Sequence, residues 1–262
     1  MSSKRHPVKL FFWILGILLL VGVSTIAGQV VVGKVMVWML GAETFSKPLP
    51  MTIYSILSSL LAMALIVIIS TYTSIRFKRK GDKKTLVAPK RNWRTEKKTI
   101  GLSDWPTWTD IGLAPVGFIV YMILAAIMVG IFSQFSWFNP DEVQQVGFNH
   151  FVLGFDRILA FLTLVVVAPV SEEIIFRGWL YGKMREKIAL EYSNTFSIIA
   201  SSLLVSLLFG IIHMQWNVSV NVFAMSLVLC AMREITGTIY SGILLHMIKN
   251  GVAFWILYVM GL

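Results

Sequence analysis

The chain has 262 residues, of which 56% are hydrophobic and only 14% are charged. A soluble globular domain carries about 25% charged residues, so the composition argues against one. The net charge of +10 is concentrated between residues 76 and 98, where eleven basic residues face two acidic ones. A nucleic-acid patch is one reading of this cluster, but short cytoplasmic loops between membrane spans carry the same basic excess. We therefore expect a multi-pass membrane protein with the lipid bilayer as a partner, no nucleic acid, and the loop 76–98 in the cytoplasm.

Long uncharged segments predict membrane-spanning helices, because about 20 apolar residues cross the hydrocarbon core as a helix. The expected fold is an all-α transmembrane bundle of about seven spans, with six to eight allowed, because residues 214–237 fit either one span or a broken pair. We divide the chain into an N-terminal hairpin (1–76), a basic loop with an interfacial segment (77–110) and a transmembrane core (111–262). The helices are expected at about residues 8–40, 50–76, 111–136, 151–186, 195–214, 217–233 and 238–260.

The first polar cluster of the core is the sequence Glu-Glu-Ile-Ile-Phe-Arg at residues 172–177. Each ionisable residue inside a membrane helix costs about 2.5 kcal/mol or more, so such a cluster needs a pairing or functional role. Glu173 and Arg177 are four residues apart and can pair on one helix face. Glu172 points about 100° away and keeps no obvious local partner, which suits a general base. An ion-pair cluster at a helix end fits the same pattern.

Two further clusters contain histidine. His213 follows Phe209 at the end of the next apolar helix, and His246 precedes Asn250 by four residues in the last one. His246 and Asn250 therefore share a helix face, where their donors could stabilise an oxyanion or bond between helices. A lone histidine such as His213 more often forms an interhelical hydrogen bond. Cys230 is the only cysteine, so the sequence offers no intramolecular disulfide.

The ordered set Glu-Glu-x-x-x-Arg, Phe-x-x-x-His and His-x-x-x-Asn resembles the CAAX protease and bacteriocin-processing family. Its members are also called ABI-domain or CPBP intramembrane glutamic endopeptidases. The resemblance covers about residues 110–260, and it extends to Phe176-Arg177-Gly178 and to Ser241-Gly242 beside the motifs. It does not extend to residues 1–100.

The resemblance implies a cell-membrane peptidase that cuts a peptide or protein substrate, in bacteriocin or signal-peptide maturation or in self-immunity. It assigns water activation to Glu172 and His213, and the oxyanion to His246 and Asn250. Glu173 and Arg177 become supporting residues. No cofactor is expected. Zinc held by Glu172, His213 and His246 is the alternative, although the chain has no H-E-x-x-H motif.

Two other functions stay open at this stage. A non-catalytic immunity or sequestration protein could use the same scaffold, and a proton-coupled transporter also buries Glu and His. The absence of internal repeats weighs against a transporter. The depth of the site is open as well, because His213 lies about 22 Å into its helix, whereas simple topology puts Glu172 nearer the cytoplasm.

Overall fold

The computed structural model describes residues 7–81, 100–102, 105–142 and 154–260, with side chains left out at 73–81. Every regular element in these ranges is a helix, and seven helical segments are long and apolar enough to cross a membrane. The predicted all-α multi-span bundle is therefore confirmed. Most of the basic loop 76–98 lies outside the described residues, so its cytoplasmic placement stays a prediction, as does the three-part division of the chain.

Helix boundaries follow local signals that hydropathy alone does not reveal. The predicted helix 111–136 begins earlier, at Trp108, because Thr107 and Asp110 form a capping box that satisfies the first main-chain N–H groups. The ambiguous segment 214–237 is a single helix, which ends where Gly237 adopts a left-handed conformation with φ of 72°. The elements are α1 (Pro7–Leu40), α2 (Ala42–Phe45), α3 (Pro48–Gly81), α5 (Trp108–Phe132), α6 (Phe155–Phe161), η1 (Leu162–Val167), α7 (Ala168–Glu173), η2 (Ile174–Tyr181), α8 (Gly182–Ala189), α9 (Asn194–Ile211), α10 (Trp216–Thr236), α11 (Tyr240–Trp255) and η3 (Ile256–Met260), where η denotes π-helix.

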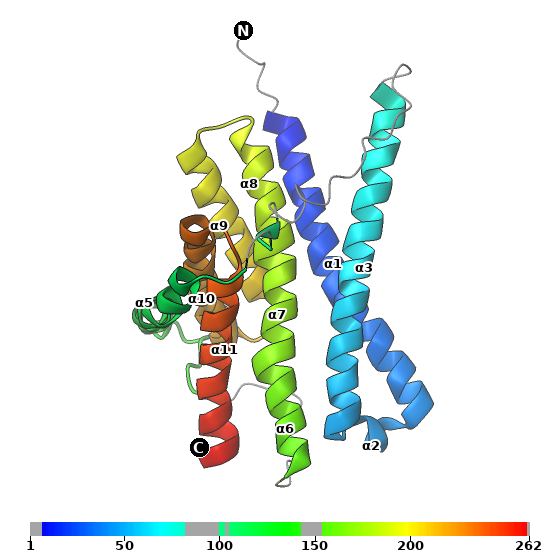
Figure 1. Ribbon diagram of the computed structural model, residues 1–262, viewed down its shortest axis with the longest axis vertical. Helices are drawn as coiled ribbons and strands as arrows, with labels where there is room; N and C mark the ends of the chain where they lie inside the picture. The colour runs from blue at the N-terminus through cyan, green and yellow to red at the C-terminus, as the bar shows by residue number, and fades with distance from the viewer. Residues whose placement is uncertain (1–6, 82–99, 103–104, 143–153, 261–262) are drawn as a thin grey trace.

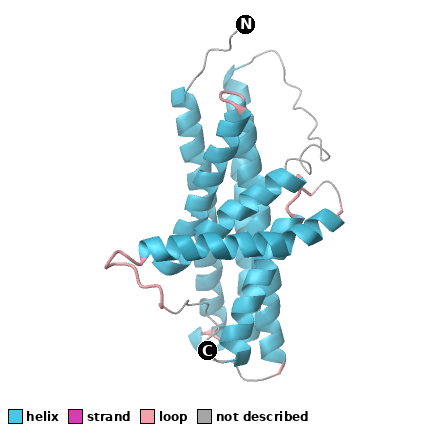
Figure 2. Cartoon of the chain, turned by 90° about the vertical axis from the view of Figure 1, so that its left-hand side faces the viewer, coloured by secondary structure: helices cyan, strands magenta, loops and turns pink. Residues whose placement is uncertain are grey.

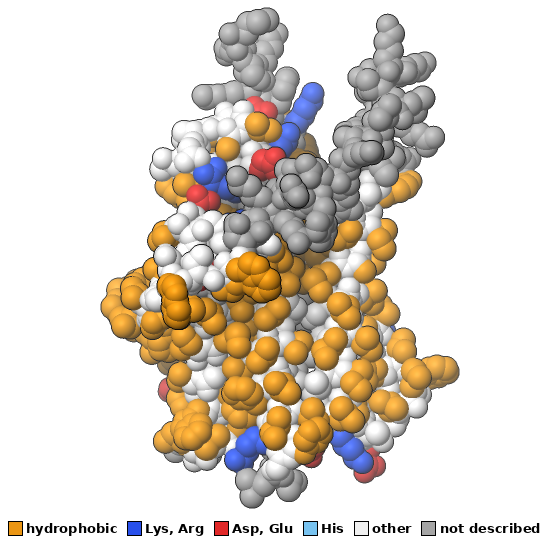
Figure 3. Space-filling view, viewed as in Figure 1, with side chains coloured by type: hydrophobic (Ala, Val, Ile, Leu, Met, Phe, Trp, Pro, Cys, Tyr) orange, Lys and Arg blue, Asp and Glu red, His pale blue; other side chains and the backbone are white. Residues whose placement is uncertain are grey.

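The segment from α6 to α8 forms one long rod at the centre of the molecule, with α1 and α3 on one side and α9, α10 and α11 on the other (Figure 1). Helix α5 lies across this second group rather than along it (Figure 2). Hydrophobic side chains cover the middle of the visible surface, and charged ones gather towards its two ends (Figure 3). This banding is what a bilayer requires of a multi-span protein.

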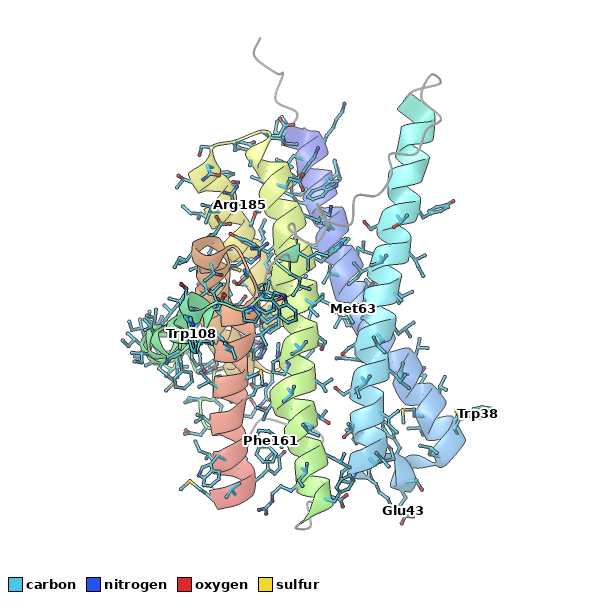
Figure 4. The ribbon with its side chains drawn as sticks, viewed as in Figure 1. Trp38, Glu43, Met63, Trp108, Phe161 and Arg185 are labelled. Atoms are coloured by element: carbon cyan, nitrogen blue, oxygen red, sulfur yellow. The ribbon has the colours of Figure 1, made fainter. Side chains whose placement is uncertain are left out.

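Close contacts between the helices fix the bundle. Helix α1 crosses α3 at Gly28, where an added Cβ would lie 2.5 Å from the carbonyl oxygen of Ser58. Phe161 of α6 points towards α11 (Figure 4), and its ring packs edge-on against Phe254 with centroids 5.4 Å apart. The first contact joins α1 closely to α3, and the second joins the central rod to α11.

A buried polar contact anchors α5 to the turn between α10 and α11. Asp110 is 1% exposed and accepts a hydrogen bond of 2.6 Å from the hydroxyl of Thr238. The same carboxylate accepts a 2.8 Å bond from the Thr107 main-chain N–H. One side chain thus caps α5 and ties its start to the base of α11, which carries part of the candidate site.

Candidate active site

The two glutamates lie deep inside the bundle. Glu172 is at the midpoint of the continuous helical span Phe155–Ala189, so about 25 Å of helix extends from it in either direction. Helices α9 and α10 do not reach the lower end of the molecule in Figure 1. His213 follows the end of α9 by two residues and therefore also lies away from the ends of the bundle. Glu172 and His213 therefore lie far from both ends of the bundle.

Glu173 belongs to a fully buried ionic cluster. Its Oε1 accepts a 2.9 Å hydrogen bond from Nη1 of Arg177, and the two side chains are 0% and 1% exposed. The same oxygen accepts a 3.1 Å bond from Nδ1 of His246 on α11. The guanidinium also lies 4.3 Å from the ring centroid of Phe209. The pairing with Arg177 is the one that the four-residue spacing predicts, whereas the contact with His246 arises only from the packing of α11.

A glycine allows α11 to approach this cluster. An added Cβ at Gly242 would lie 3.2 Å from Oε2 of Glu173 and 3.4 Å from Cδ2 of Leu229. The first distance is shorter than an ordinary van der Waals contact, so a larger residue would push α11 away from α7. The Ser241-Gly242 sequence therefore has a packing role beside the site.

Glu172 is turned away from the buried cluster and faces a cavity. Its side chain is 32% exposed, in contrast to the fully buried Glu173. Its Oε2 lies 3.8 Å from Nε2 of His246, so the imidazole stands between the two carboxylates. The rotation of about 100° per residue along the helix gives adjacent glutamates these different surroundings.

His213 presents a proton-accepting nitrogen to the same cavity. Its Nδ1 lies 2.7 Å from the main-chain carbonyl oxygen of Phe209. Because a carbonyl can only accept, Nδ1 carries the hydrogen, and in the neutral ring Nε2 keeps its lone pair. The motif Phe-x-x-x-His thus sets the tautomer through the main chain of its first residue. His213 can therefore act as a base towards a water molecule in the cavity.

Asn250 is engaged in a structural contact. Its Nδ2 donates a 2.8 Å hydrogen bond to the carbonyl oxygen of Leu164, within the π-helical segment η1. Short π-helical segments often occur at functional sites. Their main-chain hydrogen bonds follow a different pattern from those of an α-helix, so some carbonyl groups need other partners. One N–H of the amide is therefore committed to joining α11 to η1, and the second remains for other use.

One cavity of about 390 Å³ is lined by Glu172, His213, His246 and Asn250. Its volume is within the range of small-ligand sites. Sequence reasoning missed two contributions to its lining. The first is Lys249, whose position three residues after His246 was the available signal. The second is a polar wall from the N-terminal hairpin, which no local sequence pattern indicates. The residues of this wall are Thr25, Gln29, Ser58 and Ser59.

Among the described residues, no group of three or more His, Cys, Asp or Glu side chains is arranged to hold a metal ion. The zinc alternative for Glu172, His213 and His246 remains a question for metal analysis. The same side chains offer two bases and a set of donors around one space.

Residues 154–252 match the family described as type II CAAX prenyl endopeptidase Rce1-like. This segment is shorter than the predicted resemblance at about 110–260, but it contains all six candidate site residues. The match confirms the family resemblance over these residues. No curated protein and no solved structure was found to match the chain. Helices α1, α3 and α5 lie outside the matched segment.

Proposed function

We propose, on the premise of this Rce1-like segment, that the protein is an intramembrane endopeptidase of the glutamic type. It hydrolyses a peptide bond in a peptide or a membrane-associated protein. The observation that carries the proposal is the convergence of Glu172, His213 and His246, from three separate parts of the bundle, on one deep cavity. Buried ionisable groups are costly inside a membrane protein, so their convergence calls for a function.

In the proposed reaction, a water molecule bound between Glu172 and Nε2 of His213 attacks the carbonyl carbon of the scissile bond. Glu172 takes a proton from the water while the water oxygen forms a bond to that carbon. The carbonyl oxygen then becomes an oxyanion. The protonated Glu172 then gives its proton to the leaving nitrogen as the C–N bond breaks. No covalent intermediate with the protein forms.

The remaining residues support this chemistry in the proposal. Glu173 accepts from Nδ1 of His246, so that Nε2 of that ring is directed towards Glu172 and the cavity. Arg177 balances the charge of Glu173 within the buried cluster. His246 and the second N–H of Asn250 are expected near the oxyanion.

The proposal places the protein in the cell membrane, with the basic loop 76–98 in the cytoplasm. The basic charge of that loop supports this orientation. Maturation of a bacteriocin or signal peptide, or self-immunity, is the proposed role.

Comparative peptidomics of cells that produce the wild type or the Glu172→Ala variant tests the proposal. We expect a set of peptides to disappear with Glu172→Ala and to persist with Glu186→Ala, a matched change on the exposed surface of α8. Identical peptides in wild type and Glu172→Ala would refute the peptidase. An immunity phenotype that survives both Glu172→Ala and His213→Ala would favour the non-catalytic alternative.

A chelator experiment separates the two hydrolytic mechanisms. Purified protein is assayed with a fluorogenic peptide built on the identified cleavage site, with and without a strong chelator. Retained cleavage and a metal-free preparation support the Glu172 and His213 mechanism. Cleavage that is lost with chelator and restored by zinc would overturn it in favour of a zinc site.

A further inference from the structure

Lys249 is a cation in the middle of α11 that the proposed mechanism does not use. It lies three residues after His246 and directly before Asn250, so all three line the cavity that contains Glu172. Lys249 also lines a second cavity of about 300 Å³ between α5, α10 and α11. Its side chain therefore forms part of the wall that separates the two cavities.

The surroundings of Lys249 leave its ammonium group available. Within the described part of the chain, it makes no ion pair within 4.0 Å and no hydrogen bond. It interacts electrostatically with Glu172 and with His213 across the cavity. A charged lysine at the centre of a membrane helix is costly, so its charge is expected to have a function.

The two donors expected at the oxyanion are already occupied in part. Asn250 donates to the carbonyl of Leu164 at 2.8 Å. His246 stands between two carboxylate oxygens, 3.1 Å from Glu173 and 3.8 Å from Glu172. Lys249 is the remaining charged donor that lines the same cavity. Unlike the neutral amide of Asn250, Lys249 can bring a positive charge to the reacting carbonyl.

The charges of the site are consistent with this role. Glu173 and Arg177 form a closed pair, which leaves Glu172 and Lys249 as opposite charges without direct contact. When Glu172 takes a proton from the attacking water, it becomes neutral, and the carbonyl oxygen gains one negative charge. The negative charge thus moves within the cavity while the positive charge of Lys249 stays in place, so the net charge of the cavity is conserved.

We propose that Lys249 is a catalytic residue whose ammonium group donates to the oxyanion of the tetrahedral intermediate. The inference rests on the proposed peptidase function and assigns a further residue to its site. An oxyanion donor acts on the transition state more than on the bound substrate. Its loss should therefore lower kcat and leave KM nearly unchanged.

The test measures kcat and KM of the full chain in detergent micelles with the fluorogenic peptide described above. Lys249→Met should lower kcat by about 10²- to 10³-fold, as removal of an oxyanion donor does elsewhere. Lys249→Arg should recover part of the rate because it restores the charge with a different shape. Lys183→Met removes the same charge from α8, away from the cavity, and should keep the wild-type constants.

A phosphinate analogue of the same peptide provides a second readout, because its anionic oxygen mimics the oxyanion. Lys249→Met should weaken inhibition by the analogue by about the same factor as it lowers kcat/KM. Lys249→Met should also weaken inhibition by the analogue more than Asn250→Ala does. Since inhibition reports on folded protein, this readout also controls for misfolding of the variant.

The outcomes separate this inference from the function on which it rests. A raised KM with unchanged kcat in Lys249→Met would overturn the inference, because it would make Lys249 a substrate-binding residue. Wild-type constants in Lys249→Met, together with no cleavage by Glu172→Ala, would refute the inference and leave the peptidase standing. Full cleavage by Glu172→Ala would refute the peptidase itself.

Discussion

Replacement of Arg177 by methionine should destabilise the fold strongly, although Arg177 is not expected to touch the substrate. The change leaves Glu173, which is 0% exposed, with His246 as its remaining hydrogen-bond donor. Removing one partner of a buried ion pair costs about 3–5 kcal/mol, because an uncompensated charge stays buried. Loss of the contact with Phe209 at 4.3 Å adds to this cost. We expect a loss near the upper part of that range.

Cys230 supplies the assay, because it is the only cysteine of the chain and is buried. A thiol-reactive fluorogenic dye labels it only when the bundle opens. Because the Cys230 thiol lies beside Arg177, the labelling rate of each variant is divided by the labelling rate of its denatured form, and this ratio reports the free energy of opening. At about 1.4 kcal/mol per tenfold change, Arg177→Met should label about 10³-fold faster than wild type. Lys183→Met serves as the control for a lost positive charge and should label at the wild-type rate.

A double-mutant cycle then tests the reasoning behind that magnitude. Glu173→Gln alone leaves Arg177 buried without its counter-charge, so it should also be destabilised. The double variant Glu173→Gln/Arg177→Met should lose less than the sum of the single losses, because neither charge remains buried. Strictly additive losses, or an Arg177→Met variant with the wild-type labelling rate, would refute the buried pair as the cause.

Two further predictions concern the packing that carries the site. Gly28→Ala should destabilise the N-terminal hairpin by about 1–3 kcal/mol, because the new Cβ lies 2.5 Å from the carbonyl oxygen of Ser58. The control Gly16→Ala places its Cβ within 4 Å of no atom in the other described helices, so it should keep or raise the wild-type stability. Equal melting temperatures for the two variants would contradict this prediction. Thr238→Val should lower the free energy of unfolding by about 1–3 kcal/mol, because the buried carboxylate of Asp110 loses a hydrogen-bond donor. Thr238→Ser keeps a hydroxyl and should retain most of the wild-type stability. A thermal unfolding curve of Thr238→Val that overlays the wild-type curve would show that the contact is dispensable.

The helices were largely predictable because hydrophobic length is a local property of the chain. Apolar runs long enough to cross a bilayer predicted seven spans, and the structure also contains seven helices of this kind among its described residues. Boundaries were less predictable, because they depend on caps. The start of α5 at Trp108 follows from the Thr107–Asp110 capping box, which a hydropathy pattern does not register. The placement of α5 across its neighbours depends on packing and has no local signal at all.

The candidate site divides in the same way. The pairing of Glu173 with Arg177 was predictable, because a four-residue spacing on a helix fixes the neighbourhood of the two side chains. The different surroundings of Glu172 and Glu173 also followed from helix geometry. The contact of His246 with both carboxylates was not predictable. It joins α11 to α7, and the number of residues between two helices does not indicate how far apart they lie in space.

By itself, the sequence determined that the chain forms apolar spanning helices and that six polar residues in its C-terminal half resemble the motifs of a CAAX-type protease. Both properties are encoded within single helices, where the spacing of residues along the chain determines the directions in which their side chains point. Only the tertiary structure decided the depth of the site, the engagement of Asn250 with Leu164, and the addition of Lys249 and the α1–α3 wall to the cavity. These features depend on how separate helices pack, and close packing is set by contacts between residues far apart in the chain.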